Sequence, residues 1–341
     1  MPLGHRIDID GSTLRFEQDG ADTVLRAALR AGIGFPYECN SGGCGSCRFE
    51  RVAGELQVLW PDAPGLGERD RRRGRLLACQ CRATSDLTIR VRASAEYVPR
   101  VAPRRQMARL LGWDDLTHDL REFRFAADAP AEFTPGQYAS LALPGVAAPR
   151  AYSMSNLPNA DGHWDFQIRR VPGGQASGVL FDTLAVGDRV EIDAPYGLAG
   201  LREDVARDIV CVAGGSGLAP MLSVARGAAA AGLLATRRLH FFYGARTPRD
   251  VCGEALLRTL PGFGTSLVYH AVVSDAASAD AAGWAGERGF VHEAVARRLG
   301  GALDRHEFYF AGPPPMTQAL QELLMVTYRV PYTQVHFDRF F

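Results

Sequence analysis

Seven cysteines are the residues with the most distinctive chemistry, and five of them fall in the first quarter of the 341-residue chain. Four follow the order Cys39-x4-Cys44-x2-Cys47, with Cys79 after a long gap. This is the plant-type ligand spacing of a [2Fe–2S] cluster, and the small residues between the thiols let backbone N–H groups turn toward sulfur. A zinc site would need a second Cys-x2–4-Cys knuckle, for which Cys79-x-Cys81 is too tight. We therefore expect an iron–sulfur cluster.

The identity of the fourth ligand is the point that the spacing leaves open, because Cys79 and Cys81 are both candidates. The apolar approach Leu76-Leu77-Ala78 favours Cys79 as the ligand and Cys81 as a buried thiol. We expect Cys211 and Cys252 to be unliganded thiols. Clustered cysteines behind an N-terminus without a signal peptide indicate metal binding in a reducing cytoplasm rather than disulfide bonds.

Charged residues limit the other chemistry of the chain. All 38 basic side chains are arginine, and they balance 38 acidic side chains to a net charge of zero. The absence of lysine excludes a Schiff base, a lysine nucleophile and a Walker-type phosphate loop, so any phosphate must be held by arginine, hydroxyl or backbone N–H groups. Zero net charge argues against nucleic-acid binding, and no apolar run approaches the roughly 20 residues of a membrane span.

A second candidate site lies in a series of short alternating strands between about residues 110 and 200, which predicts a barrel. Within it stands Arg150-Ala-Tyr152-Ser153. An arginine can grip a pyrophosphate through two hydrogen bonds, and a tyrosine two residues on shares its face of the strand and can stack on a planar ring. The serine hydroxyl beside it can hydrogen-bond a flavin nitrogen.

Glycine-rich loops supply two further phosphate sites. The segment from Gly173 to Ser177 precedes an apolar stretch, where glycines before a helix expose N–H groups to an anion. The apolar run Ile209–Ala213 predicts a buried parallel strand that enters the loop Gly214-Gly215-Ser-Gly217. A helix over residues 221–230 follows, with Pro220 in its first turn. Strand, glycine loop and helix together indicate a dinucleotide site, although the spacing departs from G-x-G-x-x-G.

The elements that must position these sites can be predicted from periodicity. A hairpin around Asp10-Gly11, a helix capped by Asp22 and ending at Ala31, and a closing strand over 87–91 predict a β-grasp ferredoxin. Strands over 239–243, 267–273 and 308–311 predict a doubly wound α/β sheet, whose last strand leads through Gly312-Pro313 into a helix over 317–325. The arginine-rich run over 68–75 is interpreted as a solvated loop or, alternatively, as a docking site for an acidic partner.

This organisation gives a multidomain α+β and α/β chain. We expect a [2Fe–2S] ferredoxin domain over 1–95, a linker over 96–105, a six-stranded antiparallel FAD-binding barrel over 106–203 and an NAD(P)H-binding domain over 204–341.

Taken together, the motifs resemble the reductase components of bacterial multicomponent oxygenases, in which a plant-type ferredoxin is fused to a ferredoxin–NADP⁺-reductase-like module. The match includes Pro135-Gly136-Gln137-Tyr138 and the loop over 312–316. Residues 59–65 and 336–341 resemble the toluene monooxygenase reductases, whereas residues 168–174 are equally similar to naphthalene dioxygenase reductase. The partner oxygenase is therefore open between a di-iron and a Rieske type.

The resemblance implies roles for matching residues. Arg150 would hold the FAD pyrophosphate, Tyr152 would stack on the isoalloxazine, and Ser153 would reach its N5 atom. Gly174 and Ser177 would bind flavin phosphate, and Gly215 and Gly217 would approach the NADH pyrophosphate. The resemblance also implies cofactor binding by Arg169, Gly214, Pro220, Gly312 and Pro313.

The resemblance also implies catalytic positions. With Ser153, these are Asp338 and Phe340, an acidic residue and an aromatic residue near the nicotinamide side of the flavin. The family usually has a cysteine where this chain has Ala311, which bears on the rate of hydride transfer rather than on the function.

Electron counting predicts the function. NADH delivers two electrons as hydride and a [2Fe–2S] cluster accepts one, so FAD must stand between them. We expect an NADH-dependent, cytoplasmic, monomeric reductase that serves a Rieske-type ferredoxin or the hydroxylase component of an aromatic or hydrocarbon oxygenase. A preference for NADH over NADPH stays open, because Arg246 and Arg249 favour a 2′-phosphate and Asp250 a free hydroxyl. The alternatives are a stand-alone flavin oxidoreductase that acts on small acceptors and a redox-sensing module without turnover.

Overall fold

The computed structural model describes residues 4–339, which form two compact units. The first consists of the N-terminal part up to Arg105 together with Asp193–Leu198, and the second of Gln106–Ile192 with the chain from Ala199 onward. Each unit is described by itself below. None of the helices within residues 4–339 is both long and apolar enough to cross a membrane.

The first unit is built on a five-stranded mixed sheet with the order β2-β1-β7-β3-β5. The predicted hairpin is confirmed, since β1 and β2 pair antiparallel, and β7 closes the sheet parallel to β1. A separate ladder joins β4 and β6. These strands are β1 (His5–Ile9), β2 (Arg15–Gln18), β3 (Arg48–Ala53), β4 (Leu56–Val58), β5 (Arg75–Leu77), β6 (Cys81–Ala83) and β7 (Leu87–Arg90). This is the β-grasp arrangement expected of a ferredoxin.

Two predictions for this unit were wrong in detail. Helix α1 (Val24–Arg30) is capped by Thr23, whose hydroxyl accepts the Arg26 N–H, because the Asp22 carboxylate instead pairs with the Arg30 guanidinium at 2.9 Å. The arginine-rich run is not a plain loop, since it contains helix α2 (Glu68–Arg72). Acidic residues in the first turn of α2 and basic residues in its last turn complement the helix dipole, which explains how so charged a segment becomes helical.

The second unit begins with a six-stranded antiparallel barrel whose strand order is β11-β10-β13-β8-β9-β12. A bridge between Met154 and Phe166 nearly closes it. Alternate residues such as Phe123, Phe125 and Phe166 are fully buried inside. The strands are β8 (Arg104–Asp115), β9 (Leu120–Ala127), β10 (Tyr138–Ala142), β11 (Arg150–Ser153), β12 (His163–Arg169) and β13 (Arg189–Tyr196). Strand β8 begins inside the stretch interpreted as a linker, which also holds the 3₁₀ turn Ala95–Tyr97.

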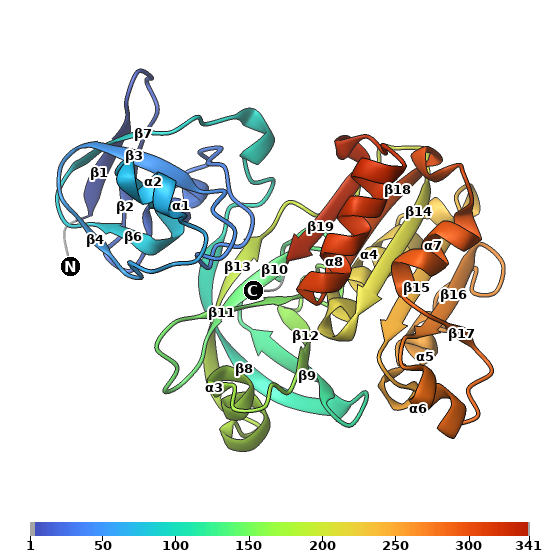
Figure 1. Cartoon of the computed structure of the whole chain (residues 1–341). Helices are drawn as coiled ribbons and strands as arrows, with labels where there is room; N and C mark the ends of the chain where they lie inside the picture. Colours follow the sequence, from blue (N-terminus) through green and yellow to red (C-terminus); the bar gives the residue numbers. More distant parts are fainter. Residues whose placement is uncertain (1–3, 340–341) are drawn as a thin grey trace. The chain divides into compact units, whose positions relative to one another are not determined.

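The rest of the second unit is a parallel sheet with the order β17-β16-β15-β14-β18-β19 (Figure 1). The chain enters at β14, adds β15 and β16 on one side, and returns to the other side with β18 and β19, so the direction of winding reverses between β14 and β18. This confirms the doubly wound prediction. The strands are β14 (Asp208–Gly214), β15 (Leu239–Ala245), β16 (Leu267–Val273), β17 (Glu287–Arg288), β18 (His306–Gly312) and β19 (Val335–Arg339).

Helices cover both faces of this parallel sheet. Helix α4 (Leu218–Ala230) packs on the face of Ile209 and Cys211, and α7 (Val291–Leu299) and α8 (Pro314–Gln321) pack on the opposite face. Two shorter helices, α5 (Glu254–Leu257) and α6 (Ala276–Ala281), lie in the crossovers.

Two helix boundaries differ from those predicted. Helix α4 starts three residues before the expected Met221, because Pro220 fits its first turn without needing an N–H. Helix α8 starts at Pro314, earlier than predicted, and passes into a π-helical turn at Glu322–Thr327.

Candidate redox centres

Four thiols gather on two loops of the first unit. Cys39, Cys44 and Cys47 lie between α1 and β3, and Cys79 lies in the 3₁₀ turn that follows β5. Pairing of β3 with β5 continues through a hydrogen bond from Ala78 N to Cys47 O at 2.9 Å, and this register places the Cys47 and Cys79 sulfur atoms 3.3 Å apart. The strand pairing therefore brings together residues that are 32 positions apart in the sequence.

Backbone N–H groups of the first loop point at its sulfur atoms, as the small residues predicted. Ser41 N and Cys44 N each lie 3.4 Å from Cys39 Sγ, and Ser46 N lies 3.4 Å from Cys44 Sγ. A hydrogen bond from the Cys44 thiol and those from Ser41 lower the pKa of Cys39, which favours its thiolate. Gly45 has a φ of +79°, and a Cβ there would lie 2.3 Å from Gly65 O. Such a tight cradle of donors fits an anionic cluster.

The three other cysteines do not join this group. Cys81 lies on β6 opposite Val58, its side chain is fully buried, and burial raises the pKa of its thiol to about 12. Cys211 is buried in β14, and burial raises its pKa. The Cys252 thiol donates to the Tyr243 hydroxyl at 3.3 Å, and burial raises its pKa to about 11. At neutral pH all three thiols are therefore protonated.

The candidate flavin strand is β11, which pairs with β10 through Tyr138 opposite Ser153. Ser153 is 7% exposed, and its hydroxyl has no hydrogen-bond partner within residues 4–339. Tyr152 is half-buried, and burial raises its pKa to about 12, so the phenol is neutral. Arg150 is exposed, and within residues 4–339 its side chain donates only to nearby main-chain carbonyls, such as Ala148 O at 2.6 Å. A free cation, a neutral ring and an unpartnered hydroxyl along one strand fit a flavin nucleotide.

The loop from Gly174 to Ser177 is closed by the Ser177 side chain. The Ser177 hydroxyl accepts the Val171 N–H at 3.1 Å and lies 3.3 Å from Gly174 O. A Cβ on Gly174 would lie 2.8 Å from that hydroxyl oxygen. Ser177 thus shapes the loop before α3 (Gln175–Gly178), and the backbone N–H groups there are the donors available to a phosphate.

The dinucleotide loop lies where the direction of winding reverses. Gly214 ends β14, and the 3₁₀ turn Gly215–Gly217 leads into α4. A Cβ on Gly217 would lie 2.0 Å from Ala311 O. Gly312 ends β18 and Pro313 follows it, so both loops meet at the carboxyl ends of adjacent parallel strands. Ligands of open α/β sheets bind at such a switch point.

Glycine at this switch point lets neighbouring groups pack closely against the backbone. A Cβ on Gly214 would lie 2.7 Å from the Met316 sulfur and 3.1 Å from Pro313. Pro220, in the first turn of α4, is buried and has no N–H of its own, and the N-cap residue of this helix, Gly217, makes no side-chain cap.

Arg169 occupies an unexpected place, beside the dinucleotide loop. It is the last residue of β12, yet its Nη1 atom lies 3.2 Å from the position of a Cβ on Gly215. Asp119 holds it through an ion pair at 2.6 Å, and Asp250 lies 3.7 Å from its Nη2 atom. Asp119 was not identified as part of a site from the sequence, because it is distant from Arg169 in the chain and belongs to no motif, and Asp250 was considered only as a reader of the ribose hydroxyl.

The Asp250 carboxylate accepts hydrogen bonds from its own loop. Its Oδ2 atom accepts from Thr247 N at 2.9 Å and from Thr247 Oγ1 at 2.7 Å. Arg246 and Arg249 are exposed at the end of β15. The two bonds from Thr247 engage Oδ2 of Asp250, whereas Oδ1 lies 3.7 Å from Arg169 Nη2.

Asp338 lies on β19 in register with Ala311, so it stands at the same end of the sheet as the glycine loops. Phe340 lies outside the described residues. The barrel meets this end of the sheet through α4, because Ser223 Oγ donates to Asn156 O at 2.8 Å and Arg226 Nη1 donates to Ser155 O at 2.7 Å. These bonds tie the continuation of the flavin strand to the helix that follows the dinucleotide loop.

Comparison with known families matches each part of the chain. Residues 7–84 match the 2Fe-2S iron-sulfur cluster binding domain, residues 108–200 the oxidoreductase FAD-binding domain, and residues 211–322 the oxidoreductase NAD-binding domain.

Whole proteins of known role are similar over nearly the full length. The chain is 43% identical to a ferredoxin–NAD(P)⁺ reductase of Metapseudomonas resinovorans, over 94% of each chain. It is 41% identical to the ferredoxin–NAD⁺ reductase component of the alkene monooxygenase system of Xanthobacter autotrophicus, over 97% of this chain and 98% of that one. The solved ferredoxin reductase in carbazole 1,9a-dioxygenase superposes with a TM-score of 0.89 at 37% identity, over 99% of both chains. The chain belongs to the family of reductase components of multicomponent oxygenases, which carry a [2Fe–2S] cluster, FAD and an NAD-binding domain.

Proposed function

We propose that this protein takes electrons from NADH and passes them through FAD and a [2Fe–2S] cluster to the ferredoxin or hydroxylase component of an aromatic or hydrocarbon oxygenase. The gathering of the Cys39, Cys44, Cys47 and Cys79 thiols carries the proposal, because a flavin oxidoreductase that acts alone on small acceptors has no use for a cluster. These four residues bind the iron atoms, and Cys81 does not.

The flavin supplies the conversion between the hydride of NADH and the single electrons of the cluster. The residues of β11 bind and orient it. Arg150 neutralises its pyrophosphate, the neutral Tyr152 ring lies on the isoalloxazine, and the Ser153 hydroxyl, which lacks another partner within residues 4–339, hydrogen-bonds near N5. Gly174 and Ser177 form the loop that receives flavin phosphate.

The dinucleotide site is formed by backbone groups. Gly214, Gly215 and Gly217 let the NADH pyrophosphate approach the N–H groups at the start of α4, and Gly312 with Pro313 forms the other wall. Pro220 keeps the first turn of α4 open. Arg169 stands beside Gly215, where its guanidinium offers N–H donors to the pyrophosphate while Asp119 and Asp250 balance its charge.

Asp338, in register with Ala311, lies on the nicotinamide side of the site, and the resemblance assigns Phe340 a role on the same side. We assign residues 1–95 to the ferredoxin domain, 96–105 to a linker, 106–203 to the flavin barrel and 204–341 to the nicotinamide domain. We further propose that the protein works as a monomer in the cytoplasm, where thiols stay reduced, and that its acceptor is a Rieske-type ferredoxin or a hydroxylase. The ferredoxin reductases to which the chain is similar support a ferredoxin acceptor.

Replacement of one ligand separates this relay from a flavin oxidoreductase that acts alone. Cys44→Ser should remove the cluster, abolish NADH-dependent reduction of cytochrome c and leave ferricyanide reduction within about twofold. Cys252→Ser, which alters a thiol outside the cluster site, is the matched control. Undiminished cytochrome c reduction by a Cys44→Ser protein without iron would contradict the relay. Failure of NADH to bleach the flavin would instead favour a sensing module.

A further inference from the structure

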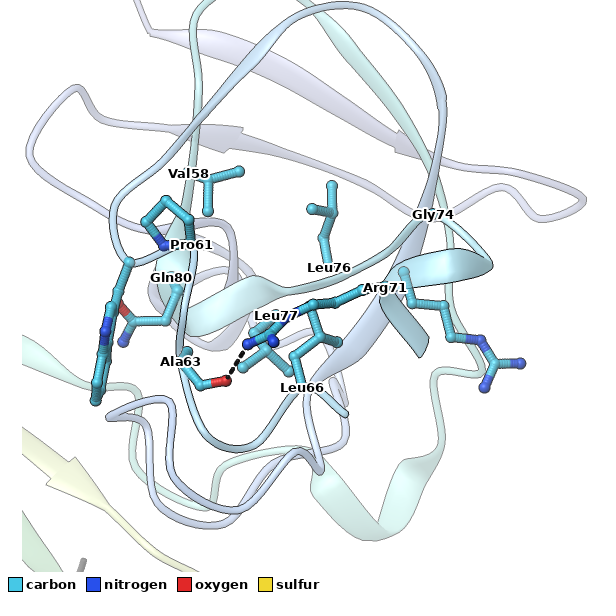
Figure 2. A pocket seen from close by; sticks show the side chains of 11 residues that line it. Val58, Pro61, Ala63, Leu66, Arg71, Gly74, Leu76, Leu77 and Gln80 are labelled. Carbon is cyan, nitrogen blue, oxygen red and sulfur yellow. Dashed lines mark hydrogen bonds between the residues drawn. The ribbon is translucent and has the colours of Figure 1, made fainter. Parts of the chain in front are cut away.

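An apolar groove of about 320 Å³ lies in the first unit beside the cluster loops (Figure 2). Val58 of β4, Leu66 of the following loop, and Leu76 and Leu77 of β5 form its apolar lining. Trp60 stands at its edge and is 45% exposed. Exposed tryptophan next to an apolar depression is a common composition of protein-binding surfaces.

Helix α2 and the loop before it hold the groove open. The Arg71 Nη2 atom donates to Ala63 O at 3.2 Å, which ties the helix to the loop (Figure 2). The Asp70 carboxylate of α2 forms ion pairs with the guanidinium groups of Arg48 and Arg75, each at 2.9 Å. These pairs connect α2 to strands β3 and β5 of the sheet. The groove is therefore a preformed feature, which lowers the ordering cost of binding a partner.

The groove lies next to the cluster ligands. Gln80 lines it, and the Gln80 Nε2 atom is 3.8 Å from Cys79 Sγ. On the other side, a Cβ added to Gly42 of the cluster loop would lie 3.2 Å from the Trp60 ring. An occupant of the groove would thus be separated from a cluster ligand by about one side chain, which is a short path for an electron.

The segment that joins the lining residues Leu66 and Leu76, called the rim here, carries an excess of positive charge. Arg69, Arg72 and Arg73 of this segment are exposed, and within residues 4–339 none of their side chains has a hydrogen bond or an ion pair. Asp62 and Glu68 are the exposed acids of this segment and the loop before it, so the arginines outnumber them even before Arg71 is counted. An acidic partner would therefore be attracted to this rim and an apolar side chain to its centre.

We propose that this groove docks the electron acceptor, through an acidic surface segment of the acceptor that places one apolar side chain against Leu66, Leu76 and Trp60. The inference rests on the proposed function and names the contact surface for its last step. In that step one electron leaves the reduced cluster and enters the metal centre of the bound acceptor, so the cluster is oxidised by one electron and the acceptor is reduced by one.

Reversal of the rim charge tests the electrostatic half of the proposal. The probe is the ferredoxin that the similar carbazole dioxygenase reductase serves, mixed in a stopped-flow instrument with the NADH-reduced protein. Arg72→Glu/Arg73→Glu should lower the second-order rate constant at least about tenfold at low ionic strength, and salt should shrink the difference. The control Arg15→Glu/Arg92→Glu makes the same change of charge at exposed positions outside the segment that joins Leu66 and Leu76, and it should stay within about twofold.

Substitution of the apolar lining tests the other half. Leu76→Gln should slow reduction of the ferredoxin several-fold at high as well as low salt, and Leu76→Met should restore it, because apolar burial is not screened. The EPR spectrum of the reduced cluster and the rate of ferricyanide reduction should be unchanged in every variant, which shows that the cluster and flavin sites are intact.

Two results would overturn the docking surface, and they differ from failure of the relay. If the wild-type protein reduces the ferredoxin and Arg72→Glu/Arg73→Glu does so at the rate of the control at every salt concentration, the docking proposal is wrong and the proposed function stands. If Leu76→Gln reduces the ferredoxin at the wild-type rate, the apolar contact is wrong. If NADH does not reduce the wild-type cluster at all, both proposals fail.

Discussion

The ferredoxin unit and the flavin–nicotinamide unit differ in whether side chains or backbone groups form their proposed sites. In the first, four side-chain thiols provide the chemistry, and the backbone only directs N–H groups at the sulfur atoms. In the second, the dinucleotide site is mostly backbone, and Gly214, Gly217 and Gly312 are important because they lack a side chain. A substitution in the first unit thus removes a ligand, whereas one in the second fills a space.

The contrast between Cys79 and Cys81 gives the largest expected effect. Cys79→Ser should lose the cluster, its EPR signal and cytochrome c reduction, because Cys79 Sγ lies 3.3 Å from Cys47 Sγ. Cys81→Ser should keep all three and lose only about 1–2 kcal/mol of the free energy of unfolding, because its hydroxyl would be buried in β6. Iron content and EPR of both variants check this, and a cluster that survives in Cys79→Ser but not in Cys81→Ser would reverse the ligand assignment.

Filling the glycine loop should have the next largest effect. Gly217→Ala places a Cβ 2.0 Å from Ala311 O, so the loop must move, and the KM for NADH should rise roughly 10–100-fold. Gly301→Ala adds the same methyl group to open space and is the matched control. Steady-state ferricyanide reduction measures the KM for NADH, and EPR should find the cluster unchanged. An unaltered KM in Gly217→Ala would contradict a backbone-built site.

Acid should weaken the second unit through a pair of histidines on its sheet. The His240 Nδ1 and His270 Nε2 atoms are 3.4 Å apart. Burial is the main cause that lowers the pKa of His270 from 6.5 to about 4, and the charges of His240 and Arg298 lower it further. The unfolded state therefore takes up the proton first, and stability is lost as the pH falls from 6.5 toward 4.

The size of this loss can be measured with one variant. After a discount for solvent screening we expect about 1–2 kcal/mol. His270→Phe, which retains the stack with Phe242, should flatten the dependence. Urea unfolding followed between pH 7 and pH 4 measures both proteins, and equal slopes in the two would exclude the histidine pair as the cause.

The smallest expected effect concerns helix caps. Thr23→Ala removes the hydroxyl that accepts the Arg26 N–H at 3.3 Å and should lower the free energy of unfolding of the ferredoxin unit by about 1 kcal/mol. Helix α4 has no side-chain cap, so Gly217 offers no equivalent loss. Thermal unfolding of the Thr23→Ala protein checks this, with Thr23→Ser expected to restore stability.

The sequence indicates the candidate side-chain site more directly than the candidate backbone sites, and the reason is physical. Thiol spacing reflects the geometry of the cluster itself, so Cys39, Cys44 and Cys47 can be identified without a fold. The glycine loops could be recognised as candidate sites only together with the strands around them, because glycine is also common in ordinary turns. The reversal of strand order between β14 and β18 brings Gly214 and Gly312 together at one candidate site.

Long-range ion pairs escaped prediction altogether. Asp22 was expected to cap a helix, but Arg30 takes its carboxylate. Arg169 was expected at a cofactor, but its contact with Asp119 and its position beside Gly215 depend on how the barrel meets the parallel sheet. A local sequence pattern does not predict which arginine pairs with a given carboxylate, because several arginines lie near each carboxylate in the sequence.

An anaerobic titration with NADH, followed by EPR, tests the central claim most directly. The account predicts that NADH alone bleaches the flavin and then produces the signal of a reduced [2Fe–2S] cluster, and that Cys44→Ser bleaches its flavin without producing the signal. A wild-type cluster that stays oxidised under excess NADH but is reduced by dithionite would contradict the relay, because the flavin would then not deliver its electrons to the cluster.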